Sequence, residues 1–500
     1  DLRVEIRCPG ETPYFDKINV AYSRCGEEGS VETVKALTGL PINYLITINF
    51  RGFRRLVDKL GGVWMDVDRR YFNDQGGECD GCYAVINLQP GYQRLTGLKA
   101  LDYVRFRHTD SDLHRNARQQ QFVRAFKDQI RTNFSITKLP QVIEVITKHV
   151  EVGEGGGADV SARTVLRYGA LAYTLPAGHV FQTRIEGLEG ASDLTTATDN
   201  IERAIEQFVR PDAEAPQKAT SVALGTKRRV KVIPPLETTV TVLNGNGITG
   251  SASSASYLLG RRSYAMVYPP NGVPANAPSF DFFETVVFFD RAREGASQAA
   301  KRATALFGSA ETRPLTPAIR KLSNGALLVV VVGRTFHGRL AAAPVDQTPD
   351  RKKAEVAPRQ DEALGLLRDV QPRVDFPLYV PKLIERTSRL SSAKPVRDYN
   401  MDPKGKHRTV RLVYRTGGND YWGIQQTSWD KAPVLSAKNF SRTIGGRRYD
   451  LYYNGPRLHM IVMRTKRATY WVVNSLLDSL SNETMIAIAK SLRPIGVVSR

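Results

Sequence analysis

The residues best suited to chemistry are five arginines gathered between positions 105 and 124. They are Arg105, Arg107, Arg115, Arg118 and Arg124. Each carries a planar, permanently charged fork, and converging forks suit a doubly charged phosphate or pyrophosphate better than lysines do. The stretch therefore predicts a site for a phosphate or pyrophosphate group. The alternative is a surface of salt bridges to Asp102, Asp110 and Asp112, because runs of charge are usually solvated.

A predicted strand would position the first pair of arginines. Arg105 and Arg107 alternate with Val104 and Phe106. This is the spacing of a strand, so both guanidinium groups are expected on one face. His108 follows directly and could serve as a general acid or base, although a structural hydrogen bond is the simpler role.

A turn and a helix would position the remaining arginines. The turn is HTDSD, and Asp110 or Asp112 is expected to cap the helix after it. Three polar side chains at i, i+3 and i+4 should share one face of this helix: Arg115, Arg118 and Gln119. Three apolar residues continue at helical spacing and should anchor it in a core: Phe122, Phe126 and Ile130. The first turn of such a helix adds N–H donors for an anion.

Length and composition indicate several ordinary globular domains. At 500 residues the chain is too long for one core, and 41% hydrophobic with 24% charged residues is a usual balance. The net charge of +21 implies attraction to an anionic partner such as nucleic acid, a membrane surface or a phosphorylated polymer. The longest apolar run, residues 326–333, is far shorter than the ~20 residues of a spanning helix. Because the chain begins with Asp1 and not Met, we expect a processed form or a fragment of a longer protein.

Several familiar motifs are absent from the sequence. It contains no Ser-His-Asp, H-E-x-x-H or P-loop pattern, and seven scattered histidines disfavour a histidine metal site. It contains no recognisable zinc finger, RNP motif or leucine zipper either. Four cysteines lie in the first sixth of the chain: Cys8, Cys25, Cys79 and Cys82. They could form two disulfides or contribute to a zinc site, and the choice depends on the cellular compartment.

The order of predicted elements divides the chain into three domains and two linkers. Residues 1–210 alternate helices and strands, which indicates an α/β domain with a mixed sheet covered by helices. Residues 237–338 indicate a small α/β domain. Residues 373–500 indicate an α+β domain of antiparallel strands closed by a helix. Residues 211–236 and 339–372 lack a sustained period and are predicted linkers.

Two further patterns have both a functional and a structural interpretation. Gly245, Gly247 and Gly250 match the dinucleotide fingerprint G-x-G-x-x-G, but no acidic residue ends the next strand, so a tight turn is favoured. Six aromatic residues of the last domain could stack on carbohydrate, but at alternate strand positions such residues are more often core. They are Trp422, Trp429, Tyr452, Tyr453, Tyr470 and Trp471.

The arginine stretch is part of a longer pattern that resembles the LytR-CpsA-Psr family. The matching segments, in this order, are DLRVEI, DKINVAYSRCG, VETVKALTGLPINYLITINFRGFRRLVDKLGGVWMDV and LTGLKALDYVRFRHTDSDLHRNARQQQF. They cover residues 1 to about 130. VTVLNGNGITGSA, within residues 238–338, is similar to the LytR C-terminal domain that often follows. The last domain is similar only to the tails of actinobacterial members.

The resemblance implies a fold, an activity and a set of site residues. The fold would be an α/β/α sandwich with a lipid tail in a hydrophobic tunnel. The activity would move a polyprenyl-pyrophosphate-linked glycopolymer onto peptidoglycan through a phosphodiester bond. By position, the pyrophosphate-binding residues would be Arg105, Arg107, Arg115, Arg118 and Gln119, and Asp112 would match the family's acidic residue just before Arg115. Substrate-binding roles would fall to Asp1, Lys17 and Asn19. Arginines and Mg²⁺ would supply the charge neutralisation that phosphoryl transfer needs.

The resemblance also implies a location and reveals a departure. Members are usually anchored by one N-terminal membrane helix, with the catalytic domain outside the cell, and such a location favours disulfides for the four cysteines. The family's metal-binding carboxylates and one pyrophosphate-binding arginine lie upstream of the position that matches Asp1. We therefore expect the chain as given to lack its metal site and a central strand, and to need the full-length protein for catalysis.

Two other functions stay open. Family members were once described as transcriptional attenuators, and the basic charge would suit DNA, although no DNA-reading element is recognisable. An arginine cage could also hold an anionic wall polymer without catalysis. Arg105→Ala separates the three hypotheses: a transferase loses turnover, a DNA-binding protein is little affected, and a binding protein loses the polymer.

Overall fold

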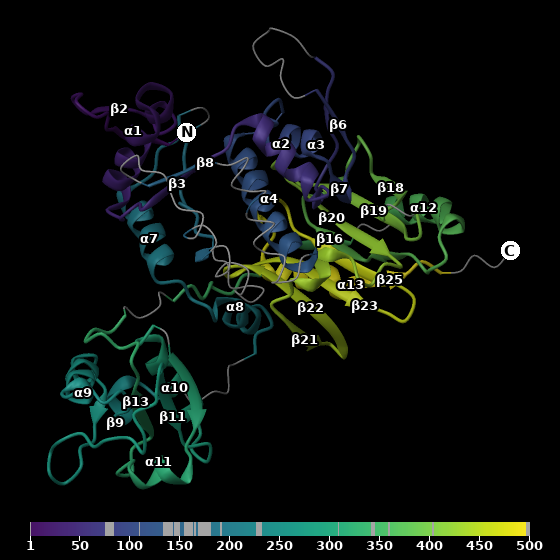
Figure 1. The fold of residues 1–500 in the computed structure, drawn as a ribbon. Helices are drawn as coiled ribbons and strands as arrows, with labels where there is room; N and C mark the ends of the chain where they lie inside the picture. Colours follow the sequence, from purple (N-terminus) through teal and green to yellow (C-terminus); the bar gives the residue numbers. More distant parts are fainter. Residues whose placement is uncertain are drawn as a thin grey trace. The chain divides into compact units, whose positions relative to one another are not determined.

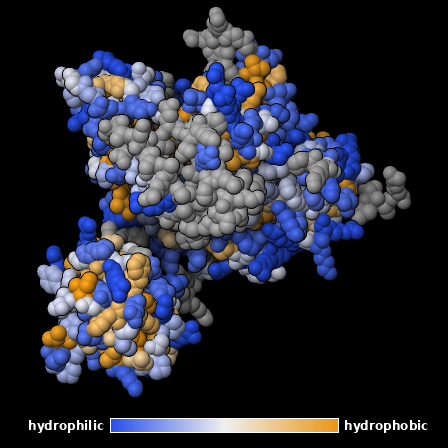
Figure 2. All heavy atoms as spheres, in the orientation of Figure 1, coloured by the Kyte–Doolittle hydropathy of each residue, from blue (hydrophilic) through white to orange (hydrophobic). Residues whose placement is uncertain are grey.

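A computed structural model describes most of the chain (Figure 1). The described residues are 2–75, 85–109, 111–133, 144, 151–154, 164, 167–168, 182–190, 193–226, 233–308, 310–341, 346–358, 361–402 and 405–496. They form two compact units. The first contains residues 1–208, 213–225 and 347–500, and the second contains residues 209–212 and 226–346. The visible surface is mainly hydrophilic (Figure 2), and no described helix is long and apolar enough to cross a membrane.

The first unit begins with a hairpin packed on a helix. Strands β1 (Arg3–Ile6) and β2 (Tyr14–Lys17) pair antiparallel, and helix α1 (Val20–Thr38) follows. Gly26, with φ of +66°, interrupts the helix, and Gly39 ends it in the left-handed conformation that glycine tolerates. A small apolar core joins these elements: Leu2, Val4, Ile6, Cys8 and Ala21.

The arginine stretch sits in a second core of the same unit. The elements of this core are α2 (Phe50–Lys59), β4 (Val63–Val67), β5 (Tyr71–Asn73), β6 (Ile86–Leu88), β7 (Gly91–Leu95), α3 (Gly97–Arg105) and α4 (Asp112–Asn133). The same unit also contains β3 (Tyr44–Thr47), β8 (Glu151–Glu154) and α7 (Thr198–Val209). The strands pair two by two and antiparallel, as β3–β8, β4–β7 and β5–β6. Alternating helices and strands confirm the α/β class. Phe122 and Phe126 of α4 pack in this core as predicted.

The predicted strand around Arg105 and Arg107 is wrong. Residues up to Arg105 form helix α3, because the apolar positions that precede it recur at helical spacing: Ala100, Leu101, Tyr103 and Val104 are all buried. The first N–H of this helix donates to the Asp58 carboxylate at 2.7 Å. Gly97 also has no room for a Cβ atom, since α2 passes directly beside it. The alternation seen in VRFR therefore falls across the end of a helix.

The C-terminal part of the first unit is an antiparallel sheet, as predicted. The strands run in the order β17-β19-β20-β24-β23-β22-β21, and β18 pairs with β19. They are β17 (Arg389–Leu390), β18 (Val396–Asn400), β19 (Arg408–Arg415), β20 (Tyr421–Thr427), β21 (Phe440–Ile444), β22 (Arg447–Asn454), β23 (Arg457–Arg464) and β24 (Thr469–Val473). Helix α13 (Asn482–Ser491) closes the sheet, and Ser481 caps it by accepting from the N–H of Thr484. Strands β14 (Val356–Pro358), β15 (Tyr379–Pro381), β16 (Leu383–Glu385) and β25 (Leu492–Pro494) lie at its margins as two short pairs.

Both predicted linkers contain a helix in the structure. Residues 215–223 form α8 (Ala215–Ala223), and residues 361–370 form α12 (Asp361–Val370). Each has an apolar face that enters the C-terminal core, through Ala219 of α8 and through Ala363 and Leu367 of α12. Short runs of alanine and leucine gave too weak a period to reveal these faces in the sequence.

Within the first unit, the C-terminal sheet packs on β4 and β7. Arg411 of β19 is completely buried and donates to Asp66 of β4 at 3.1 Å. The Tyr399 hydroxyl donates to the carbonyl of Tyr92 at 2.9 Å. Its ring lies so close to Gly91 that a Cβ atom there would overlap the hydroxyl. The sheet thus covers polar as well as apolar surface of the arginine region.

The second unit is a small α/β domain. Its sheet has the order β10-β9-β13-β11-β12, with parallel and antiparallel neighbours. The elements are β9 (Thr239–Asn244), α9 (Ser251–Arg261), β10 (Ala265–Met266), β11 (Thr285–Phe289), α10 (Ala296–Ala305), β12 (Ala310–Pro314), α11 (Pro317–Lys321) and β13 (Leu328–Val332). The glycine motif forms the turn between β9 and α9, where Gly247 and Gly250 have positive φ and Gly245 has no room for a Cβ atom. Each glycine of the motif therefore has a structural reason to be there.

Candidate active site

One buried carboxylate holds two of the predicted arginines together. Asp112, the first residue of α4, has a side chain that is 8% exposed. Its Oδ1 lies 2.9 Å from Nε of Arg107 and 3.1 Å from Nη2 of Arg115. The two guanidinium groups are 40% and 27% exposed. A buried anion thus fixes a pair of partly exposed cations at the start of a helix, which is the arrangement an anionic ligand needs.

Arg118 has a different place from its predicted partners. Its side chain is fully buried, and Nε donates to the carbonyl of Tyr103 at 2.9 Å. It also donates to the carbonyl of Phe106 and, at 3.4 Å, to the hydroxyl of Tyr71. The guanidinium carbon lies 5.2 Å from the centre of the Tyr71 ring. In this structure Arg118 ties the end of α3 to α4, whereas the exposed Gln119 lies outside, with its amide 3.4 Å from the carbonyl of Val104.

Arg105 lies apart from the pair on Asp112. It is the last residue of α3, and its guanidinium carbon sits 4.1 Å from the centre of the Phe50 ring. One helical turn earlier, burial raises the pKa of Asp102, and the nearby charges of Arg105 and Arg54 oppose this rise. In the structure the predicted cage is therefore split. Arg107 and Arg115 form a pair on Asp112, Arg118 is buried, and Arg105 stacks on Phe50.

A chain of buried polar side chains links Arg118 to Asp68 through the hydroxyl of Tyr71. Burial raises the pKa of Asp68, and Arg69, Tyr71 and Arg118 oppose the rise. The Tyr71 hydroxyl donates to Asp68 at 2.7 Å. The Arg69 guanidinium carbon lies 4.5 Å from the centre of the Tyr71 ring and 5.3 Å from that of Tyr421. Arg69 was not singled out from the sequence. Its position directly after Asp66 and Asp68 at the end of a predicted strand was the available signal.

The C-terminal domain contributes Asp420, a residue that no sequence pattern placed at this site. Nε2 of His114, in the first turn of α4, lies 2.8 Å from Oδ1 of Asp420 in the turn between β19 and β20. Nδ1 of the same imidazole lies 3.0 Å from Oγ of Ser111. A Ser-His-Asp chain thus exists in space although no such pattern exists in the sequence.

The other predicted substrate-binding residues do not join the pair on Asp112. Nζ of Lys17 lies 3.4 Å from the carboxylate of Asp193. Asn19 is exposed and precedes α1 without capping it. Within the described part of the chain, neither contacts the arginine pair through a hydrogen bond or ion pair. Asp1 and Asp110 lie outside the described residues.

Arg124 lines a cavity instead of the predicted cage. It hydrogen-bonds Gln182, and burial lowers the pKa of its guanidinium. The cavity, of about 150 Å³, lies between α4 and the C-terminal sheet. Its lining includes Ala117, Gln121 and Arg124 from α4 and Tyr452, His459 and Met460 from the sheet. Tyr452 and the buried Trp471 belong to the apolar cluster between the two layers, so these aromatic residues are core.

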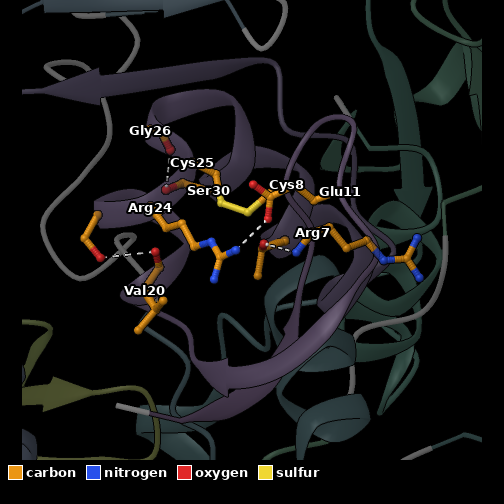
Figure 3. The surroundings of a disulfide bond; sticks show 10 residues. Arg7, Cys8, Glu11, Val20, Arg24, Cys25, Gly26 and Ser30 are labelled. Atoms are coloured by element: carbon orange, nitrogen blue, oxygen red, sulfur yellow. Dashed lines mark hydrogen bonds and ion pairs between the residues drawn. A yellow bond between two sulfur atoms is a disulfide. The ribbon is translucent and has the colours of Figure 1, made fainter.

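Two of the four cysteines form a disulfide (Figure 3). Cys8 follows β1 and Cys25 lies in α1, and their Cα atoms are 5.4 Å apart. The adjacent Arg24 donates to the Glu11 carboxylate at 3.1 Å and so reinforces the same junction. The predicted disulfide role is confirmed for this pair. Cys79 and Cys82 lie outside the described residues.

The described residues offer no fit for the metal that the family resemblance implies. Among them, no three His, Cys, Asp or Glu side chains come together as possible ligands. The carboxylates nearest the arginine pair are already engaged, Asp112 with two arginines and Asp420 with an imidazole. Magnesium therefore stays a prediction from the resemblance.

Comparisons with known proteins agree with the resemblance. Residues 1–194 match the LytR_cpsA_psr family, and residues 237–336 match the family described as LytR cell envelope-related transcriptional attenuator. TagV of Bacillus subtilis, named a polyisoprenyl-teichoic acid–peptidoglycan teichoic acid transferase, is 34% identical over 153 residues, which are 30% of this chain and 38% of TagV. Regulatory protein MsrR of Staphylococcus aureus is 27% identical over 194 residues, which are 38% of this chain and 50% of MsrR.

The crystal structure of B. subtilis TagV is 24% identical in sequence and aligns with a TM-score of 0.33 over 42% of this chain and 78% of that chain. The chain spans half or less of the length of the curated relatives named here. The two family matches fall on the first and second of the three domains expected from the sequence. Residues 1–194 are therefore a LytR-CpsA-Psr family domain, and a LytR C-terminal domain follows at residues 237–336.

Proposed function

We propose that the full-length protein moves a glycopolymer from a polyprenyl-pyrophosphate carrier onto peptidoglycan, and forms a phosphodiester bond. The relatives named teichoic acid transferases support a transferase that acts on wall polymers. The identity of the glycopolymer is not part of the proposal. The place of action would be the outer face of the cytoplasmic membrane, and the partners would be the lipid-linked polymer and peptidoglycan, not nucleic acid.

The observation that carries this proposal is the pair of arginines on Asp112. Arg107 and Arg115 both contact Oδ1 of that residue and remain partly exposed. A pyrophosphate carries charge on several oxygens, and two forks fixed side by side would bind them before and during reaction. Because Asp112 already orients both groups, little rearrangement is required when the phosphate arrives.

The chemistry then needs positioning more than covalent assistance. A sugar hydroxyl of peptidoglycan would attack the phosphorus that carries the glycopolymer, and polyprenyl phosphate would leave. The arginine pair would neutralise charge on the phosphoryl oxygens and on the leaving group. Mg²⁺ is proposed as a cofactor of the full-length protein, where it would add Lewis-acid stabilisation. Arg118 would act indirectly, because it holds the end of α3 against α4.

The test is transfer of a synthetic polyprenyl-pyrophosphate glycan to peptidoglycan fragments by the full-length protein with Mg²⁺. Arg107→Ala and Arg115→Ala are compared with Arg291→Ala, an exposed arginine in the second unit. Product formed by the parent and the control, and lost in the two site variants, supports the transferase. Lipid binding without product by every form favours a binding protein.

MsrR is named a regulatory protein, so a regulator is the second candidate. Binding of duplex DNA is measured with the same variants, over a range of salt concentrations. Sequence-specific binding that survives Arg107→Ala, together with no transfer, would favour the regulator. If no form binds the lipid, the salt-bridge interpretation of the arginines would replace the transferase.

A further inference from the structure

A hydrogen-bonded chain links the start of α4 to the C-terminal sheet. Oγ of Ser111 lies 3.0 Å from Nδ1 of His114, and Nε2 of His114 lies 2.8 Å from Oδ1 of Asp420. The imidazole and the carboxylate are both largely buried, with 17% and 13% of their side chains exposed. Asp420 is 306 residues away in sequence. The C-terminal domain therefore reaches the first turn of the arginine helix.

The C-terminal domain holds Asp420 through its backbone and its carboxylate. The N–H of Asp420 donates to Oγ1 of Thr416 at 3.2 Å, and Oγ of Ser475 lies 3.5 Å from Oδ2. A carboxylate held in this way keeps the proton of His114 on Nε2. Nδ1 then carries the free electron pair and points toward the exposed Ser111 hydroxyl. The imidazole is thus oriented as a proton acceptor.

The residue that occupies Nδ1, Ser111, stands one helical turn before Arg115 of the arginine pair. Ser111 precedes α4, and the N–H of Arg115 donates to its carbonyl at 3.2 Å. Three and four residues along a helix bring side chains onto the same face, so Ser111 is a common neighbour of His114 and Arg115. Asp420 faces the imidazole from the opposite turn. Asp112 and Arg115 are the charged residues within two positions of His114 on its own helix, and Arg107 is joined to them through Asp112.

We propose that His114 is the general base of the transfer, and that Asp420 of the C-terminal domain is its positioning residue. This inference rests on the proposed transferase function. The acceptor hydroxyl would replace the Ser111 hydroxyl at Nδ1 and give its proton to that atom as the oxygen–phosphorus bond forms. The bond from phosphorus to the oxygen of polyprenyl phosphate breaks, and that group leaves with the electron pair. His114 then releases the proton to water or to the departing phosphate.

The simpler reading is a contact that only caps α4 and joins two domains. The two readings differ in the pH dependence of the rate. A base must be neutral to accept a proton, so the rate of the parent falls as the pH is lowered. A contact that is only structural gives no such dependence on His114. General-base catalysis contributes about 10²–10⁴-fold to a rate.

The experiment measures transfer by the full-length protein between pH 5 and 9, with donor binding measured separately. His114→Ala and His114→Gln should lower kcat by about 10²–10⁴-fold with donor affinity retained. Both variants should also lose the acidic limb of the pH profile, which is the fall in rate that the parent shows as the pH is lowered. Asp420→Asn should lower kcat with donor affinity retained, because the amide no longer fixes the tautomer and the orientation of the His114 ring. His337→Ala, an exposed histidine of the second unit, is the matched control.

Either of two results would overturn the inference while the transferase stands. In one, both His114 variants transfer at rates close to the parent. In the other, their rates fall but the acidic limb of the pH profile is unchanged, which assigns a structural role. His114→Gln keeps a hydrogen-bonding group of similar size, so it guards against a variant that fails to fold. If the parent shows no transfer, the proposed function fails first, and Arg107→Ala will not differ from the parent.

Discussion

Replacement of Arg118 should separate stability from chemistry within the arginine stretch. The guanidinium is fully buried and donates to two main-chain carbonyls, those of Tyr103 and Phe106. Arg118→Ala would leave both carbonyls buried without a donor, at about 1–3 kcal/mol each. The expected loss is therefore about 2–6 kcal/mol of unfolding free energy. Arg115→Ala removes a partly exposed ion pair, worth about 1 kcal/mol or less.

The assay is urea unfolding followed by tryptophan fluorescence. All four tryptophans of the chain lie in the first unit, so the signal reports that unit and not the second. If parent and variant share the same dependence of unfolding free energy on urea concentration, the shift in the urea midpoint multiplied by that slope gives the difference in unfolding free energy. Both variants should lose transfer, but Arg118→Ala should lose much more stability than Arg115→Ala.

Equal stability of the two variants would refute this reasoning. It would mean that Arg118 leaves its buried position easily, and that its contacts with the carbonyls contribute little. Arg118→Lys is the informative companion, because a lysine keeps the charge but cannot donate to two separated carbonyls with a planar fork. It should fall between the parent and Arg118→Ala in midpoint.

Three further outcomes follow from other parts of the fold. Hydrogen bonds from Arg320 and from a backbone N–H hold the pKa of Asp290 at about 2, below its ordinary 3.8. Its contribution to the second unit should therefore be present above pH 3.8 and lost as pH falls through about 2. Carboxyl NMR titration of Arg320→Ala should show a pKa that rises toward 3.8 but stays below it, because the N–H of Ala292 still donates to the carboxylate. Loss of the disulfide between Cys8 and Cys25, which are 17 residues apart in sequence, should lower the free energy of unfolding by about 3 kcal/mol. The first hairpin should then exchange its amide hydrogens faster, and unchanged exchange would contradict this prediction. Gly97→Ala places a methyl group against the backbone of α2 and should cost about 1–3 kcal/mol in the urea assay, whereas a neutral result would mean that α2 and α3 can separate.

Local patterns were enough to predict much of the fold. The helix at residues 112–133 follows from its charged face and from Phe122 and Phe126 at helical spacing. The C-terminal strands follow from alternation and from glycine turns such as the one at Gly445 and Gly446. The disulfide role of Cys8 was predictable from the compartment, but its partner was not, because four cysteines allow three pairings.

The remaining features depend on contacts that sequence spacing does not record. The alternation around Arg105 is too short to outweigh the helical period of the residues before it. Helical spacing placed Arg118 on a polar face, but whether that face meets solvent or the carbonyls of α3 depends on how two helices pack. The partner of His114 lies in another domain, so sequence spacing singled out His108 instead, as a possible general acid or base with a structural hydrogen bond as the simpler role.

The buried pair of Arg411 and Asp66 has a consequence for the order in which the chain folds. The two residues are 345 positions apart, and the whole second unit is inserted between them. During synthesis from the N-terminus, β4 and β7 must wait for β19 before their outer face is covered. Until then Trp64, Tyr92 and a carboxylate without its cation remain accessible. Contacts between residues so far apart in sequence form slowly and leave apolar surface exposed in the meantime. Expression of residues 1–208 alone should therefore favour aggregation over a folded domain.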